Sequence, residues 1–303
     1  MDRILIRGGK KLRGKVSVSG SKNAALPIMA AAIMCEEPVT LQGIPDLLDI
    51  GGMEHLLCSM GLGVEHRGQE ITIDPRTLRW PEAPYDLVRK MRASFFVLGP
   101  LIAKTRRARV SLPGGCAIGS RPVDIHIKAL QELGVQIDVE HGYVEATAEG
   151  TGKLVGARVT LDFPSVGATE NLITAAAVAS GKTIIHNAAC EPEVADVAGF
   201  LNSMGANIQG AGTPRIEIEG VQRLHGGKYH IIPDRIEAGT YLVAAAITGG
   251  EITLENACPG LMTSTLEKLT QAGAEIQVNG GEIFLKGPER PKAIADISTL
   301  PYP

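Results

Sequence analysis

The stretch LPGGCAIGSRPVDIH, residues 112–126, carries the side chains best suited to chemistry. It combines three glycines and two prolines with one thiol, Cys116, and one guanidinium, Arg121. A long loop rich in glycine and proline is typical of a lid or a binding loop when it lies inside a compact chain. Arg121 and His126 are close enough in sequence to favour the thiolate of Cys116, which is the reactive form. We therefore interpret Cys116 as a functional thiol, and the alternative is an exposed loop thiol without a role.

The loop ends in Arg121-Pro122-Val123-Asp124, which is typical of a helix start. Proline is favoured at the first helical position, and the free N–H groups there can bind a phosphate. The planar guanidinium of Arg121 suits a phosphate or a carboxylate. An ion pair between Arg121 and Asp124 is an equally common reason for such residues, so both interpretations stay open.

Similar groups stand just before other apolar segments of the chain. In Ser21-Lys22-Asn23 the lysine could bind an anion together with the N–H groups of a helix start. The alternative is a solvated lysine beside an N-cap formed by Ser21 or Asn23. Ser165-Val166-Gly167 and Arg92 hold the corresponding places before two further segments. Asp234-Arg235, at a fourth such place, is more typical of a structural ion pair.

The segments that must position these groups are predicted helices, apolar on nearly every side and therefore expected inside a domain. They are residues 23–34, 92–103, 169–179 and 238–248. A strand, a one-sided helix ending at a glycine and a hairpin follow each of them. The four glycines, spaced by 73, 71 and 68 residues, are Gly61, Gly134, Gly205 and Gly273. With an opening strand ahead of each apolar helix, the chain predicts an α/β fold of four βαβαββ units around an internal helical core.

Composition narrows the class of protein. At 303 residues, with 44% hydrophobic and 21% charged residues, the chain predicts a globular protein of two domains. The net charge of −3 and 4% aromatic residues argue against nucleic acid as a partner. The five cysteines show no metal-binding spacing, and the four other than Cys116 lie in contexts typical of small buried side chains. Free thiols, with no apolar run long enough to span a membrane, favour a cytoplasmic protein without membrane insertion.

Five motifs closely resemble the UDP-N-acetylglucosamine enolpyruvyl transferases, which begin bacterial peptidoglycan synthesis. They are SGSKNAALP, MRASFFVLGP, PGGCAIGSRPVD, SVGATENLITAAA and PDRIEAGTYLVAAA. The resemblance covers essentially the whole chain. It implies the enolpyruvyl transferase fold, two inside-out α/β barrels with three βαβαββ units each. By that plan residues 21–232 form one complete domain that carries the cysteine loop, and residues 1–20 with 233–303 form a partial domain lacking about two units.

The resemblance also implies a reaction and its residues. The enolpyruvyl group of phosphoenolpyruvate passes to the sugar 3′-hydroxyl of UDP-N-acetylglucosamine, phosphate is released, and no cofactor or metal takes part. Cys116 matches a proton donor that can also bond covalently to phosphoenolpyruvate and that fosfomycin alkylates. Lys22 with Asn23 matches the phosphoenolpyruvate site, to which Arg121 also contributes. The matches to the sugar-nucleotide site are Arg92, Arg121, Pro122, Val123, Asp124, Ile125, Ser165, Val166 and Gly167. The implied biological role is cell-wall biogenesis, and with it cell shape and division.

This sequence departs from the family pattern in two places, and both bear on substrate binding and activity. Some members have a basic residue where this chain has Phe163, so one diphosphate contact is expected to be missing. The family's catalytic aspartate would follow Pro303, so we expect a fragment or a short form that is inactive or impaired, with exposed apolar helix faces. A sugar-nucleotide-binding relative without activity is one alternative. A 5-enolpyruvylshikimate 3-phosphate synthase-like enzyme is another, although that enzyme lacks the cysteine loop.

Overall fold

The computed structural model describes residues 3–88, 91–113, 123–148, 154–294, 297–298 and 300–302. The chain forms two compact units. The larger unit is Ser21–Ile232 with Pro301–Pro303, and the smaller unit is Met1–Gly20 with Pro233–Leu300. Each unit has a hydrophobic core of its own.

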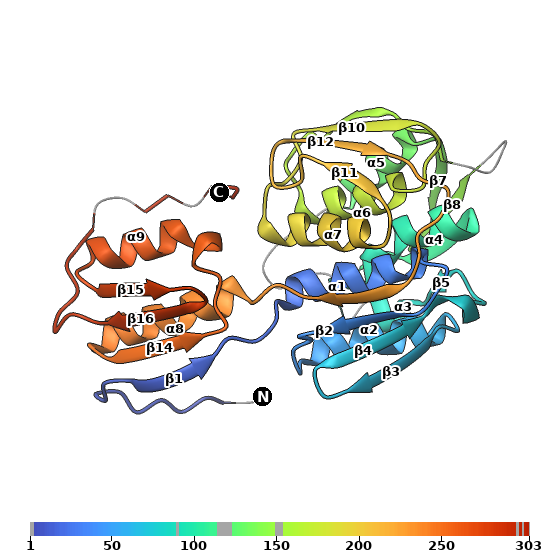
Figure 1. Ribbon diagram of the computed structural model, residues 1–303. Coiled ribbons are helices and arrows are strands. Elements are labelled where there is room, and N and C mark those ends of the chain that lie inside the picture. Colours follow the sequence, from blue (N-terminus) through green and yellow to red (C-terminus); the bar gives the residue numbers. More distant parts are fainter. Residues whose placement is uncertain are drawn as a thin grey trace. The chain divides into compact units, whose positions relative to one another are not determined.

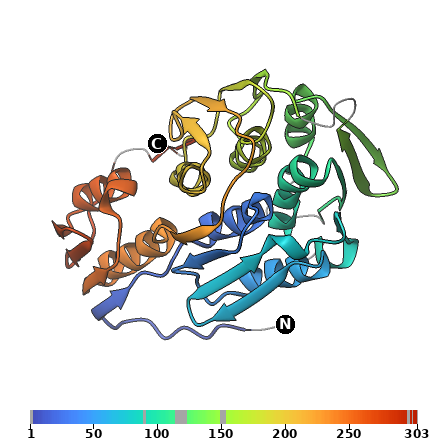
Figure 2. The ribbon, with the colours of Figure 1, turned by 45° about the vertical axis from the view of Figure 1, so that its right-hand side comes forward.

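The larger unit contains helices on the inside and strands on the outside (Figures 1 and 2). Its helices are α1 (Lys22–Ala31), η1 (Ala32–Met34), α2 (Leu48–Ser59), η2 (Pro75–Thr77), α3 (Tyr85–Val88), η3 (Arg92–Val97), α4 (Leu98–Thr105), α5 (Asp124–Glu132), α6 (Val166–Ala176) and α7 (Pro192–Ser203). Its strands are β2 (Val39–Gln42), β3 (Gly63–Arg67), β4 (Glu70–Asp74), β5 (Glu82–Ala83), β6 (Arg107–Ser111), β7 (Val135–Glu140), β8 (Tyr143–Ala148), β9 (Arg158–Thr160), β10 (Lys182–His186), β11 (Asn207–Gln209), β12 (Arg215–Glu219) and β13 (Gly227–His230).

The smaller unit is built around one sheet. Its elements are β1 (Arg13–Ser17), α8 (Arg235–Thr248), β14 (Glu251–Glu255), η4 (Pro259–Leu261), α9 (Thr263–Gln271), β15 (Glu275–Asn279) and β16 (Glu282–Lys286).

All four sheets share one topology, which confirms the predicted repeat. Their orders are β13-β2-β4-β3, β5-β6-β8-β7, β9-β10-β12-β11 and β1-β14-β16-β15. In each sheet the first pair is parallel and the next two pairs are antiparallel. The predicted strand EITID is β4, in which Ile71 and Ile73 are fully buried while their neighbours are partly exposed. This alternation turns one face of the sheet toward the internal helices.

Two strands pair in one unit although the helix that follows each of them in the chain belongs to the other unit. β1 leads along the chain into α1, yet it pairs with β14 of the smaller unit. β13 leads into α8, yet it pairs with β2 of the larger unit. The chain therefore crosses from one unit to the other near Gly20 and again near Pro233, and these two residues form a β-bridge.

Three of the four apolar helices are buried as predicted. All residues of α1 from Ala24 to Ala31 are buried, and so are the residues of α6 from Ala168 to Ala176. The second apolar segment forms η3 followed by α4, which packs against α6. Small alanine side chains let such helices approach closely enough to form one aliphatic core.

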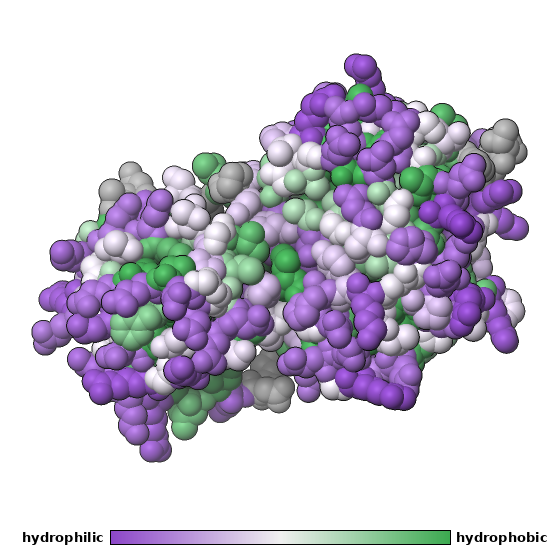
Figure 3. Space-filling view, viewed as in Figure 1, coloured by the Kyte–Doolittle hydropathy of each residue, from purple (hydrophilic) through white to green (hydrophobic). Residues whose placement is uncertain are grey.

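The prediction of burial is wrong for one side of α8. Ala238, Leu242 and Ala245 are buried on its inner side, whereas Val243 is 49% and Ile247 70% exposed. The single sheet and α9 pack against this helix, and no further sheet of the smaller unit is present among the described residues. Figure 3 shows hydrophobic residues at the surface of the smaller unit.

Candidate active site

The start of α1 presents the predicted lysine. Ser21 is the N-cap, and its hydroxyl accepts a hydrogen bond from the Ala24 N–H at 3.4 Å. The Lys22 ammonium lies 2.7 Å from a carboxylate oxygen of Asp49 on α2, and both side chains are more than one-third exposed. Asn23 is exposed beside it. Because an ammonium has three N–H donors, this contact leaves capacity for an anion.

The start of α6 repeats this construction. Ser165 is the N-cap, and its hydroxyl accepts from the Ala168 N–H at 3.4 Å. Val166 and Gly167 follow as the first two helical residues, and both are half-buried. Two of the four apolar helices therefore begin with a serine cap and free backbone N–H groups, which suits an anion. Phe163, just ahead, is 57% exposed.

The start of α5 lies against the start of α6 through a histidine. Val123 is the N-cap of α5, Asp124 is exposed, and Ile125 packs against the core. His126 is buried, and its ring packs edge-on against Phe95 with the ring centroids 5.2 Å apart. A Cβ atom on Gly167 would lie 3.1 Å from Cε1 of His126, so the glycine allows this close contact.

A buried asparagine joins the same elements. Asn171 of α6 is 1% exposed, and its Oδ1 accepts from the Gly99 N–H at 2.8 Å. Its Nδ2 donates to the Phe95 carbonyl at 3.1 Å and lies 3.0 Å from Nδ1 of His126. The elements that begin at Arg92, Asp124 and Val166 thus meet at one amide.

Several predicted residues cannot be placed in this arrangement. Cys116, Arg121 and Pro122 lie outside the described residues. The expectation that Pro122 takes the first helical position is wrong, because α5 begins at Asp124 with Val123 as its N-cap. The backbone of Arg92 begins η3, but its side chain lies outside the described part of the chain.

Three of the other cysteines differ from a reactive thiol. Burial raises the pKa of Cys35 to about 12. Burial also raises the pKa of Cys58 and of Cys190, and a nearby glutamate adds to both shifts. A raised pKa lowers the fraction of nucleophilic thiolate. The expectation that all four are buried holds only for Cys35, because Cys190 and Cys258 are half-buried and Cys58 is exposed on α2.

A buried carboxyl group stands one turn inside α6. Glu170 is 1% exposed, and its carboxyl oxygens have no hydrogen-bond partner among the described residues. Burial, helped by the charges of Glu193 and Glu191, raises its pKa well above the ordinary value. Glu170 therefore binds its proton much more tightly than a solvent-exposed glutamate does.

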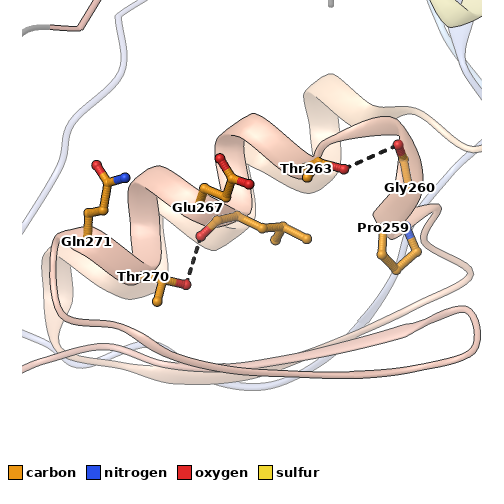
Figure 4. A pocket seen from close by; sticks show the side chains of 7 residues that line it. Pro259, Gly260, Thr263, Glu267, Thr270 and Gln271 are labelled. Carbon is orange, nitrogen blue, oxygen red and sulfur yellow. Dashed lines mark hydrogen bonds between the residues drawn. The ribbon is translucent and has the colours of Figure 1, made fainter.

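A hollow on the smaller unit is a different feature (Figure 4). It is lined by Pro259, Gly260, Thr263, Leu266, Glu267, Thr270 and Gln271. Figure 4 shows the hydroxyls of Thr263 and Thr270 bonded to backbone carbonyls of their own segment. This lining includes a carboxylate and no cationic side chain among the described residues, which makes it unsuited to a polyanionic ligand.

The described residues show neither a metal site nor a membrane-spanning helix. They contain no group of three or more His, Cys, Asp or Glu side chains arranged to hold a metal ion. None of the described helices has both the length and the apolar character that crossing a membrane requires.

Reasoning from the sequence did not identify Asn171, His126 or Asp49 as positioning groups. One signal was available for Asn171, because an amide inside the apolar run TENLITAAA must find partners when it is buried. No comparable signal marks Asp49, since acidic residues are common on exposed helices.

Comparison with known proteins agrees with this geometry. The profile of the EPSP synthase (3-phosphoshikimate 1-carboxyvinyltransferase) family matches residues 6–303. Two relatives, from Desulfosudis oleivorans and Thermotoga maritima, are each 52% identical to the chain over its whole length and are named UDP-N-acetylglucosamine 1-carboxyvinyltransferase. The chain covers 72% of each of these relatives.

Solved structures confirm the predicted fold. The enolpyruvyl transferase NikO from Streptomyces tendae matches 94% of this chain and 68% of its own with a TM-score of 0.80 at 24% identity. EPSP synthase from Acinetobacter baumannii matches 95% of this chain and 67% of its own with a TM-score of 0.73. The chain belongs to the EPSP synthase (3-phosphoshikimate 1-carboxyvinyltransferase) family, and within it resembles the relatives named UDP-N-acetylglucosamine 1-carboxyvinyltransferase.

Proposed function

We propose that this protein is a transferase that moves the enolpyruvyl group of phosphoenolpyruvate to the 3′-hydroxyl of UDP-N-acetylglucosamine. The observation that carries this proposal is the 52% identity to UDP-N-acetylglucosamine 1-carboxyvinyltransferases across the whole chain. The serine-capped starts of α1 and α6 support it, because both substrates carry phosphate groups. The reaction would serve peptidoglycan synthesis in the cytoplasm.

The roles proposed for individual residues follow from the family motifs. Lys22 and Asn23 bind phosphoenolpyruvate together with Arg121, and the exposed ammonium beside Asp49 supports this role. The sugar nucleotide binds to Arg92, to the segment from Arg121 to Ile125 and to the start of α6. Ser165, Val166 and Gly167 would supply the backbone N–H groups of that helix start.

The proposed chemistry consists of an addition and an elimination. In the addition, the sugar oxygen bonds to C2 of phosphoenolpyruvate, its proton passes to a base, and C3 accepts a proton from Cys116. In the elimination, C3 loses a proton and the bond from C2 to the phosphate oxygen breaks, which restores the double bond and releases phosphate. Cationic groups and helix N–H groups lower the energy of the charge that develops on the phosphate. No cofactor is needed, although Cys116 could form a covalent adduct with phosphoenolpyruvate.

The test combines turnover, binding and labelling. Any phosphate release should depend on both substrates, and a rate like that of the family would overturn the expectation that this chain is inactive or impaired. A Cys116→Ala variant should lower the rate by about 10²-fold or more. Calorimetry with UDP-N-acetylglucosamine separates catalysis from its alternative, because binding without turnover would indicate a non-catalytic relative. Fosfomycin should label Cys116 and leave Cys58, the exposed thiol of α2, unlabelled. Phosphate release with shikimate 3-phosphate as the acceptor, in place of the sugar nucleotide, would contradict the proposal.

A further inference from the structure

The hydrogen bonds of Asn171 determine how its side-chain amide is oriented. The backbone N–H of Gly99 can only donate, so the atom that accepts from it at 2.8 Å must be the amide oxygen. The amide nitrogen then faces the Phe95 carbonyl and Nδ1 of His126. Both N–H donors and the oxygen of this buried side chain are therefore used.

This orientation sets the tautomer of His126. An amide nitrogen only donates, so Nδ1 of His126, at 3.0 Å, must accept. The neutral ring consequently carries its proton on Nε2. A Cβ atom on Gly167 would lie 3.3 Å from that nitrogen, so the Nε2 edge of the ring lies beside the start of α6.

Two of the three partners of Asn171, Phe95 and His126, come from elements that carry the proposed sugar-nucleotide contacts. Phe95 belongs to η3, which begins at Arg92. His126 belongs to α5 and follows Ile125 directly. Asn171 itself lies one turn beyond Gly167 in α6. One amide thus fixes the distances among three groups of contact residues that are far apart in the sequence.

We propose that Asn171 is a positioning residue of the sugar-nucleotide site, an inference that rests on the proposed function. It holds η3, α5 and α6 in register, and it keeps His126 in the tautomer with Nε2 protonated beside Gly167. Asn171 does not touch the substrate. Its effect on binding passes through the elements it joins.

The test uses Asn171→Asp, which keeps the shape of the side chain but replaces its two N–H donors with an acceptor. The carboxylate should draw a proton to Nδ1 of His126, and ¹⁵N NMR of the imidazole nitrogens reports this change directly. We expect UDP-N-acetylglucosamine, titrated by calorimetry into the full chain, to bind about tenfold more weakly or worse, because small displacements of binding groups are costly.

Asn202→Asp is the matched control. Asn202 of α7 also uses both ends of its amide, donating to the Ile208 carbonyl and accepting from the Ile208 N–H, each at 2.9 Å. These bonds stabilise the turn between α7 and β11, away from η3 and α5. We expect Asn202→Asp to lower stability and to leave the affinity for the sugar nucleotide within twofold of the original.

Each outcome decides between the two proposals. If the unaltered chain fails to bind UDP-N-acetylglucosamine, the proposed function fails, and the inference fails with it. If the unaltered chain binds and the two variants weaken binding equally, Asn171 is a purely structural residue and the inference alone is overturned. Should Asn171→Asp not fold, His126→Leu replaces it, and a folded His126→Leu protein with unchanged affinity overturns the inference. A His126 ring with Nδ1 protonated in the unaltered chain would also overturn it.

Discussion

Adjacent residues of α6, Glu170 and Asn171, are both 1% exposed and respond to burial in different ways. Asn171 exchanges every hydrogen bond with water for one with the protein, so its burial adds order without leaving a polar atom unpaired. Glu170 has no such partners for its carboxyl oxygens among the described residues, and burial raises its pKa well above the ordinary value. Asn171 therefore positions the proposed site, and Glu170 makes the stability of the fold depend on pH.

Glu170→Gln should therefore change how stability depends on pH. The pKa of Glu170 is raised in the folded state, so its stabilising effect is complete below the unfolded pKa and is lost as pH rises through the folded pKa. Relative to the glutamine variant, the original chain should lose up to about 1.4 kcal/mol per pH unit above about pH 4.5. Urea unfolding at a series of pH values measures this difference.

Glu217→Gln is a control for which the change of stability with pH should have the opposite sign. Hydrogen bonding from Lys182, with Arg215 nearby, lowers the pKa of the surface carboxylate of Glu217. Its stabilising effect is present above the unfolded pKa and disappears as pH falls through the folded pKa. Parallel pH profiles for the Glu170→Gln protein and the original chain would contradict our account of Glu170.

Among the elements, the contact between α4 and α6 depends on a glycine. A Cβ atom on Gly99 would lie 2.5 Å from the backbone oxygen of Asn171 and 2.6 Å from its Oδ1. Gly99→Ala should therefore force the helices apart and lower the free energy of unfolding by about 1–3 kcal/mol. Denaturant unfolding measures the loss.

Gly51→Ala, on α2, is the matched control. Nothing lies within 4 Å of a Cβ atom at Gly51, so alanine there should stabilise the helix by about 0.5–1 kcal/mol. A similar loss of stability in both variants would show that close packing of α4 on α6 is not the cause.

Many of the individual helices and strands could be predicted from the sequence, because each depends mainly on its local pattern of residues. The alternation in EITID predicted the bounds of β4, and the polar residues before NAALPIMAAAIM predicted where α1 begins to within a residue or two. The local pattern of β1 and β13 did not reveal their exchange, since both strands have the same pattern and their partners lie far along the chain. Only the family resemblance implied it, through the domain bounds 21–232 and 1–20 with 233–303. The role of Asn171 was hidden for the same reason, because its partners come from three other segments.

From the exposed apolar side of α8 we predict that the protein aggregates at high concentration. Ile247 is 70% exposed on an apolar helix, and exposed apolar surface promotes aggregation. Ile247→Lys should reduce light scattering of the concentrated protein while changing stability by less than about 0.5 kcal/mol. Leu48→Lys, at the start of α2 where the side chain is 96% exposed, is the control and should have little effect. Equal reductions would indicate a general effect of added charge.

For the whole molecule, the two separate cores predict that the two units unfold in separate transitions. The larger unit is continuous from Ser21 to Ile232, and the Ser21 N–H donates to the Ile232 carbonyl at 2.8 Å. Residues 21–232 produced alone should fold. Their thermal midpoint should lie within about 4 °C of the matching transition in the full chain, which corresponds to a loss of roughly 1 kcal/mol. Circular dichroism and calorimetry measure both.

Removing residues 1–20 from the full chain is the complementary experiment. It deletes β1 and leaves the edge of β14 unpaired, so the transition of the smaller unit should be lost while that of the larger unit remains. Loss of both transitions, or an unfolded fragment 21–232, would show that the two cores depend on each other.

The exchange of opening strands also has a consequence for synthesis on the ribosome. Arg13 of β1 pairs with Glu251 of β14, so the first strand to leave the ribosome must wait for a partner made 238 residues later. At about 5–20 residues per second, that wait is roughly 10–50 s. The larger unit has all of its helices and strands by Ile232 and can fold during this interval. The N-terminal strand stays unpaired until β14 has been made, and an unpaired strand of a nascent chain can pair wrongly with other edges.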